Sequence, residues 1–224
     1  MNDLAELLQS GLEHHRAGRL VEAERNYRHV LDIHPRHAKA FHLLGLVAFQ
    51  AGKPELAAEL IGQAIKIDAF HAPFAADLGE VYRALDRLPE AVASYRKALE
   101  INPEMPDAWT RLGVLLDSTG NVEEAAACFH EALGVAPDYA EAHQALGRHL
   151  QAQGKAAEAL VEFERVVLLA PNDGPAYLDL GRALHAQGRL LDAIACYQKA
   201  SRLDPSLVEA QQLQQAARQA IAPA

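Results

Sequence analysis

The chain has 224 residues, half of them hydrophobic, and a formal net charge of −9 at pH 7. The acidic balance argues against a nucleic-acid-binding protein, which needs a basic face. The chain lacks an apolar run of about 18 residues, so no membrane-spanning helix is expected. The first residues, Met1-Asn2-Asp3-Leu4, lack the basic and apolar segments of a signal peptide, so we expect a cytoplasmic protein without membrane insertion.

One glycine and one alanine recur every 34 residues along the chain. The glycines are Gly11, Gly45, Gly79, Gly113, Gly147 and Gly181, and the alanines are Ala23, Ala57, Ala91, Ala125, Ala159 and Ala193. Glycine costs about 1 kcal/mol relative to alanine inside a helix, so its recurrence indicates a neighbouring helix too close for a β-carbon. We expect the alanine twelve residues further on to be the partner in that contact. A period of this length is typical of stacked helical hairpins.

In chain order, the repeats run over residues 4–37, 38–71, 72–105, 106–139, 140–173 and 174–207. Apolar residues recur at steps of three and four in two blocks of each repeat, which predicts two amphipathic helices of about 13 residues. A glycine between the blocks favours a left-handed turn that ends the first helix. In the third repeat Asp86 takes the place of this glycine, and aspartate tolerates the same conformation.

The pattern changes after Pro205. Residues 208–222 begin like another first helix, but five glutamines make the segment polar. A solenoid needs a terminal element with a polar outer face, so we interpret residues 208–222 as a capping helix. The alternative is a connection to a further domain.

The residues at fixed repeat positions, numbered from 1 to 34, resemble the tetratricopeptide repeat family. That family has a large residue at position 4, leucine and glycine at 7 and 8, alanine at 20, an aromatic residue at 24 and proline at 32. The fourth repeat carries them as Trp109, Leu112, Gly113, Ala125, Phe129 and Pro137. The resemblance implies an all-α fold: a right-handed α-solenoid of six hairpins plus a C-terminal capping helix, forming a single domain over residues 1–224.

In that family the first helices of the hairpins line a concave groove, which repeat positions 2, 5, 6, 9, 12 and 13 face. The resemblance therefore implies a binding face for a protein or peptide ligand on the first helices. Its candidate residues are Leu8, Leu12, His15, Lys39, His42, Leu43, Leu46, Phe49, Asp77, Glu80, Arg83, Arg111, Asp117, Gln144, Arg148, Arg182 and His185.

The apolar members of this set gather near the N-terminus. They are Leu8, Leu12, Leu43, Leu46 and Phe49. An exposed apolar cluster usually marks a contact surface, so this N-terminal patch favours partner binding or a homo-oligomer. The alternative is that residues 1–3 or the first helix cover the patch, or that the groove narrows there.

Two arginines, Arg148 and Arg182, share position 9 of adjacent repeats. Guanidinium groups bind carboxylates and phosphates through paired hydrogen bonds, so these side chains could receive an anionic group of a ligand. Asp179 lies one helical turn before Arg182, and ion pairs with either arginine are the alternative.

Catalytic chemistry has little support in the sequence. The histidine pairs His14-His15 and His34 with His37 lack a neighbouring cysteine or carboxylate set. There is no glycine-rich phosphate loop, serine elbow or paired-cysteine zinc spacing. The lysine–asparagine clamp and the asparagine ladder of specialised family members are also missing. We therefore predict a non-catalytic protein–protein interaction scaffold with no catalytic residue, no metal site and no cofactor.

Two alternative functions stay open. The segments Tyr27-Arg28-His29-Val30-Leu31 and Phe41-His42-Leu43-Leu44-Gly45-Leu46 resemble the opening repeats of large bacterial glycosyltransferases, methyltransferases and sulfotransferases. The chain would then be a substrate-recruiting arm whose catalytic domain is absent from this sequence. In the second alternative, the chain is an assembly scaffold that self-associates through its N-terminal patch.

Overall fold

The computed structural model describes residues 2–221, with side chains from residue 4 onward. Within this range it contains thirteen α-helices and no strand. The first helices of the hairpins are α1 (Asn2–Arg16), α3 (Ala38–Gln50), α5 (Ala72–Ala84), α7 (Pro106–Ser118), α9 (Ala140–Ala152) and α11 (Gly174–Ala186). The second helices are α2 (Leu20–Ile33), α4 (Pro54–Ile67), α6 (Leu88–Ile101), α8 (Val122–Val135), α10 (Ala156–Leu169) and α12 (Leu190–Leu203), and α13 (Val208–Ile221) follows. The array of helix hairpins expected from the sequence is confirmed.

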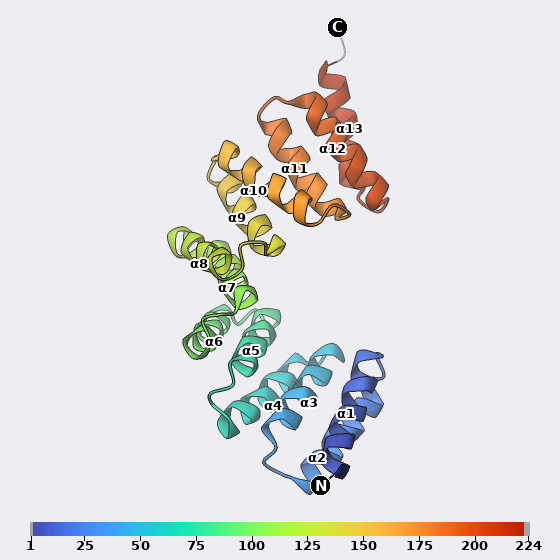
Figure 1. Ribbon diagram of the computed structural model, residues 1–224, viewed down its shortest axis with the longest axis vertical. Coiled ribbons are helices and arrows are strands. Elements are labelled where there is room, and N and C mark those ends of the chain that lie inside the picture. The colour runs from blue at the N-terminus through green and yellow to red at the C-terminus, as the bar shows by residue number, and fades with distance from the viewer. Residues whose placement is uncertain (1, 222–224) are drawn as a thin grey trace. The chain divides into compact units, whose positions relative to one another are not determined.

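The helices form two compact units, and the boundary between them falls inside α7, between Ala108 and Trp109. In the first unit, α3 packs against α2 and α4, and α5 packs against α4 and α6 (Figure 1). In the second unit, α9 packs against α8 and α10, and α11 packs against α10 and α12. These helices therefore bury their apolar faces on neighbours within their own unit, which lets short helices persist. The single domain over residues 1–224 stays a prediction.

The recurring glycines lie where a first helix crosses a large side chain of the second helix. A β-carbon at Gly147 would lie 2.7 Å from Cε1 of Phe163, and one at Gly79 would lie 2.9 Å from Cε1 of Tyr95. Such overlaps force a packed core to shift, so any larger residue is unfavourable there. The expected partner is therefore wrong in most repeats, because the nearest contact is the residue sixteen positions further on, at repeat position 24. At Gly45 the predicted alanine also takes part, since the backbone oxygen of Ala57 would lie 3.2 Å from a β-carbon there.

The turns between paired helices follow the sequence pattern. Gly18, Gly52, Gly120, Gly154 and Gly188 all have positive φ angles. Asp86 occupies the same turn in the third hairpin with φ of 57°. A residue with a β-carbon is disfavoured in this left-handed region, although aspartate is among the better tolerated. Asp86 is thus a locally strained position in an otherwise regular series.

Helix α13 packs against α12 and closes the last hairpin. Its Ala210 and Ala217 are fully buried, whereas Gln211, Gln215 and Gln219 are exposed. This division into an apolar inner side and a polar outer side is what a solenoid cap requires. The capping helix predicted from the glutamine-rich tail is confirmed.

Candidate functional site

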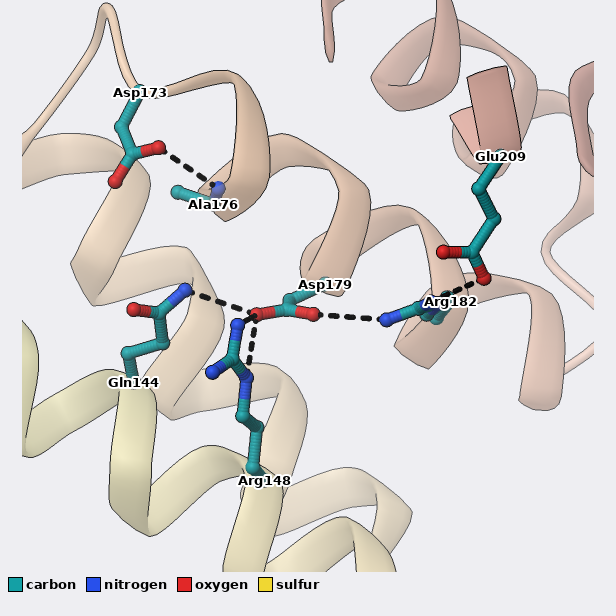
Figure 2. Close-up of polar contacts among 7 residues, drawn as sticks. All are labelled: Gln144, Arg148, Asp173, Ala176, Asp179, Arg182 and Glu209. Atoms are coloured by element: carbon teal, nitrogen blue, oxygen red, sulfur yellow. Dashed lines mark hydrogen bonds and ion pairs between the residues drawn. The ribbon is translucent and has the colours of Figure 1, made fainter. Parts of the chain in front are cut away.

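A cluster of polar side chains joins three helices of the second unit (Figure 2). Gln144 and Arg148 come from α9, Asp179 and Arg182 from α11, and Glu209 from α13. We call these five residues the Asp179 cluster. Its centre is the carboxylate of Asp179, whose side chain is only 4% exposed.

The carboxylate of Asp179 accepts hydrogen bonds from three side chains. Arg148 donates from Nε at 2.9 Å and from Nη2 at 2.6 Å to Oδ2, and Gln144 donates from Nε2 to the same oxygen at 3.0 Å. Arg182 donates from Nη1 to Oδ1 at 3.3 Å. A buried carboxylate is costly unless it is paired and hydrogen-bonded, and these donors meet that requirement. The intramolecular pairing considered for Arg148 and Arg182 is therefore present.

Glu209 connects the capping helix to the same cluster. Its carboxylate accepts a hydrogen bond from Nη2 of Arg182. This hydrogen bond, together with the negative charges of Glu209 and Asp179, raises the pKa of Arg182 above its usual value. The cluster thus holds two arginines against two carboxylates and has no net charge.

The repeat register explains why these side chains meet. Gln144 and Arg148 are four residues apart on α9 and therefore lie on one face of the helix. Asp179 lies 35 residues after Gln144 and 31 residues after Arg148, which is close to one repeat length. It therefore lies on the next first helix, opposite these two side chains. The first unit repeats one of these contacts, because Nε2 of His42 lies 2.7 Å from Oδ2 of Asp77, also 35 residues further on.

Arg148 remains accessible although it is paired. Its side chain is 57% exposed, and its Nη1 has no hydrogen-bond partner among the residues that the structure describes. Two of its donors are held by Asp179, so the plane of the guanidinium is fixed while its outer edge faces solvent. Arg148 is therefore a pre-oriented donor on the first-helix face.

The N-terminal patch is largely taken up by packing between hairpins. Leu43 is 7% exposed and belongs to a core cluster with Tyr27, against which the half-buried Leu8, Leu12 and Leu46 pack. Phe49 packs in the same way on the next cluster, which contains Ile61 and Phe74. Leu8, Leu12, Leu46 and Phe49 stay partly accessible beside these contacts, so partner binding through this patch stays a prediction. A cover made by residues 1–3 involves side chains outside the described part of the chain.

His42, the polar neighbour of this patch, is also buried, at 8% exposure. Its ring lies 4.5 Å from the ring of Phe74, measured between centroids, and contacts Asp77 as described above. Lys39 is exposed one helical turn earlier on α3. On the first-helix face of this unit, the residues at the centre of α3 therefore hold hairpins together.

Several of the other predicted groove residues form hydrogen bonds with side chains of their own hairpin. Glu80 accepts hydrogen bonds from Arg83 and from the hydroxyl of Tyr95, the latter at 3.0 Å. His185 lies 3.4 Å from the hydroxyl of Tyr197 through Nδ1. Arg111 is exposed on α7. These contacts are made within single hairpins.

In the first hairpin, His15 and Tyr27 occupy the repeat positions that His185 and Tyr197 occupy in the sixth, but no hydrogen bond joins them. The Nε2 of His15 and the hydroxyl of Tyr27 are both buried, and neither atom has a hydrogen-bond partner among the described residues. The two rings are in edge-to-face contact, with centroids 6.4 Å apart. Tyr27 thus lacks the polar partner that Tyr95 and Tyr197 have.

Sequence reasoning missed His149. This residue is 1% exposed on α9, and its Nδ1 lies 2.8 Å from Oδ1 of Asp117 on α7. It occupies repeat position 10, which faces the core, so the groove positions did not include it. The predicted groove residue Asp117 is held by this contact.

The described residues contain no group of three or more histidine, cysteine, aspartate or glutamate side chains placed to hold a metal ion. None of the described helices combines the length and the hydropathy that crossing a bilayer requires.

Comparison with known proteins identifies the repeat. Models of the tetratricopeptide repeat match residues 8–72, 82–148 and 145–208. Among curated proteins, the chain is similar to the cell division cycle protein 16 homologs of Homo sapiens and Mus musculus, with 29% identity over 125 residues in each case. The match covers 51% of this chain and 20% of either relative, so the chain spans about a fifth of the length of the curated relatives it matches.

Solved structures of similar fold cover nearly the whole chain. One is that of PilF from Pseudomonas aeruginosa, with a TM-score of 0.84 and 20% identity, covering 96% of this chain and 98% of that one. Another is YrrB, described as a tetratricopeptide repeat protein with an unusual peptide-binding site, with a TM-score of 0.65 and 21% identity over 84% of this chain and 97% of that one. At these identities the likeness concerns the fold. Together with the repeat models, which match well over half of its residues, it establishes that this chain belongs to the tetratricopeptide repeat family.

Proposed function

We propose that this chain is a non-catalytic scaffold that binds a protein or peptide segment on the first-helix face of its second unit, around the Asp179 cluster. The observation that carries this proposal is the state of Arg148, which is fixed by Asp179 and still 57% exposed. A donor that is already oriented loses little freedom when a ligand binds, so more of the interaction energy appears as affinity.

The chemistry of the cluster indicates what such a segment would present. The arginines are balanced by Asp179 and Glu209, so the surface offers directed hydrogen bonds without a net positive charge. Peptide carbonyls and polar side chains match these donors. A free phosphate or carboxylate would have to compete with the two carboxylates already present, which disfavours a strictly anionic ligand.

Similar proteins are in keeping with this role. YrrB is described as having an unusual peptide-binding site, and a further chain of similar fold, with a TM-score of 0.81, belongs to the APC/C hetero-tetramer Cut9–Hcn1. Both cases join this helical repeat to the binding of another polypeptide. The two alternatives, a recruiting arm of a larger transferase and a self-associating scaffold, have no specific observation in their favour here.

The test is a pull-down from the native host with matched arginine variants. Arg148→Gln keeps one donor for Asp179 but removes the exposed guanidinium edge. The control is Arg165→Gln on α10, which removes an arginine that is 46% exposed and pairs with Asp138 on a different side of the hairpin. We expect Arg148→Gln to lose partners that Arg165→Gln retains. The same partners at the same yield for both variants and for the unaltered chain would contradict the proposal.

A further inference from the structure

A cleft of about 410 Å³ opens in the second unit between α8 and α10, with α9 at its base. We call it the α8–α10 cleft. Its volume lies in the range of pockets that hold small ligands or single anchoring side chains. The first-helix face discussed above involves Arg148 and Asp179, neither of which lines this cleft. It is thus a separate surface.

Part of the cleft lining is apolar. Leu146 and Leu150 from α9, Val122 from α8 and Val161 from α10 form this part, together with the buried ring of His149. Val161 is 62% exposed and Val122 is 40% exposed, so both aliphatic side chains are accessible at the cleft. An exposed apolar surface of this kind, rimmed by polar residues, marks an interaction site.

A short side chain forms part of the cleft wall on α8. Ala126 lies in the run Ala125-Ala126-Ala127, which follows the first turn of the helix, and it lines the cleft. The second repeat also has alanine at this repeat position, and the other four repeats have larger residues there, namely Glu24, Val92, Leu160 and Ile194. On α8 this position therefore contributes only a methyl group to the cleft wall.

The rim of the cleft is acidic. Glu123 on α8 and Glu158 on α10 both line it, and neither has a hydrogen-bond or ion-pair partner among the described residues. Lys155 is the one lysine or arginine in the described lining. The surrounding sequence adds to this field, because residues 112–147 contain six carboxylates and no lysine or arginine. A low-dielectric wall next to unpaired carboxylates concentrates cationic groups.

We propose that the α8–α10 cleft binds a cationic amphipathic segment of a partner protein. One aliphatic or aromatic side chain of that segment inserts between Val122 and Val161 onto Leu146. Lysine or arginine residues next to it form ion pairs with Glu123 and Glu158. Charge complementarity favours this occupant over an anionic one, which the two carboxylates would repel, and over a purely apolar one, which would form no ion pair with them.

The experiment selects ligands without assuming their sequence. The probe is a phage-displayed library of random 12-residue peptides, panned on the immobilised full chain. Enriched peptides are then synthesised with a fluorophore, and their dissociation constants are measured by fluorescence anisotropy for the unaltered chain and for two charge-reversed variants. Circular dichroism melting curves first establish that both variants fold.

The cleft variant is Glu123→Lys with Glu158→Lys. Its matched control is Glu131→Lys with Glu164→Lys, which makes the same change of charge on the same two helices at exposed positions outside the cleft. A third variant, Val161→Ser, tests the apolar part. We expect enriched peptides with lysine or arginine next to an aliphatic or aromatic residue, at least tenfold weaker binding to the cleft variant, and at least threefold weaker binding to Val161→Ser. The control should stay within about twofold of the unaltered chain.

Three results would overturn the proposal. The first is an enriched set without basic residues. The second is equal weakening by the cleft variant and its control, which would indicate a diffuse acidic field and no defined site. The third is unchanged binding to Val161→Ser, because the apolar side chain would then not enter the cleft.

Discussion

The first-helix faces of the two units use the same repeat positions in different ways. In the first unit, position 9 of the second repeat is Leu46, which packs among the leucines between hairpins. In the second unit, position 9 of the fifth repeat is Arg148, which is held by a carboxylate of the next hairpin and stays exposed. Adjacent hairpins can thus be joined by apolar packing or by a hydrogen-bonded ion pair at equivalent places. The second arrangement leaves an oriented guanidinium group exposed at position 9, and we place the proposed site there for this reason.

The largest effect is expected at the apolar contacts of the first unit. Leu43→Ala removes a buried side chain from the cluster around Tyr27, which should lower the free energy of unfolding by about 2–5 kcal/mol through lost burial and the cavity left behind. The control is Leu191→Ala, where the leucine is 72% exposed and the change should stay within about 0.5 kcal/mol. Both values come from urea unfolding followed by circular dichroism. A change at Leu43 as small as that at Leu191 would contradict the buried position of Leu43 between the hairpins.

A smaller effect is expected at the centre of the Asp179 cluster. Asp179→Asn keeps the shape of the side chain but places an amide donor opposite guanidinium donors, so unfolding should become easier by about 1–3 kcal/mol. Asp192→Asn is the matched control, because Asp192 pairs with Arg189 at a site where both side chains are about half exposed. Exposed pairs contribute about 1 kcal/mol or less, so the control should change little. A larger loss at Asp192 than at Asp179 would remove the distinction between a buried and a surface carboxylate.

A third comparison isolates single hydroxyl groups within the first unit. Tyr95 and Tyr27 are both fully buried, but only Tyr95 donates a hydrogen bond to Glu80. Tyr95→Phe should therefore cost about 1 kcal/mol, the typical net contribution of such a bond. Tyr27→Phe should be neutral or slightly stabilising, because it removes a buried hydroxyl that has no partner. Thermal unfolding of the two variants side by side measures the difference, and identical melting temperatures would show that the hydroxyl of Tyr27 has a partner in solution.

The smallest effect concerns the turn that contains Asp86. Asp86→Gly should raise the free energy of unfolding by about 0.5 kcal/mol, because glycine adopts the positive φ angle without a steric cost. The gain is limited, since glycine also adds freedom to the unfolded chain. Hydrogen exchange of the α5–α6 hairpin offers the required local precision. Faster exchange in the variant would indicate that the aspartate side chain stabilises this turn.

Most of the fold could be predicted from the sequence because the period fixes it. The glycines recur at close helix contacts and at the turns, and the polar tail marks the last helix. The helices are found at the residues where these signals place them. The partner of the glycines could not be read from spacing, since an alanine twelve residues away and a ring sixteen residues away both lie on the facing helix. In the structure the nearest contact is the side chain at position 24, such as the ring of Phe163 at Gly147.

The site was less predictable than the fold. Repeat register assigns a residue to a face, but burial depends on the size of the side chains opposite it. Leu43 occupies a groove position and is nevertheless covered by its neighbours. Asp179 illustrates the same point, because the sequence allowed a free arginine pair or an ion pair, and the choice depended on the contact between two separate repeats. The α8–α10 cleft is lined by residues of three helices from two repeats, and this combination could not be read from the repeat pattern.

The most direct test of the proposed ligand face is site-specific photo-crosslinking in the native host. A benzophenone amino acid is placed at position 2 of two first helices, replacing Glu141 on α9 or Lys39 on α3, both of which are exposed. Glu141 lies one helical turn before Gln144 in the Asp179 cluster, whereas Lys39 lies one turn before the buried His42. We predict that a partner polypeptide is crosslinked from position 141 and at most weakly from position 39. Stronger crosslinking of the same partner from position 39 would contradict the placement of the binding face in the second unit.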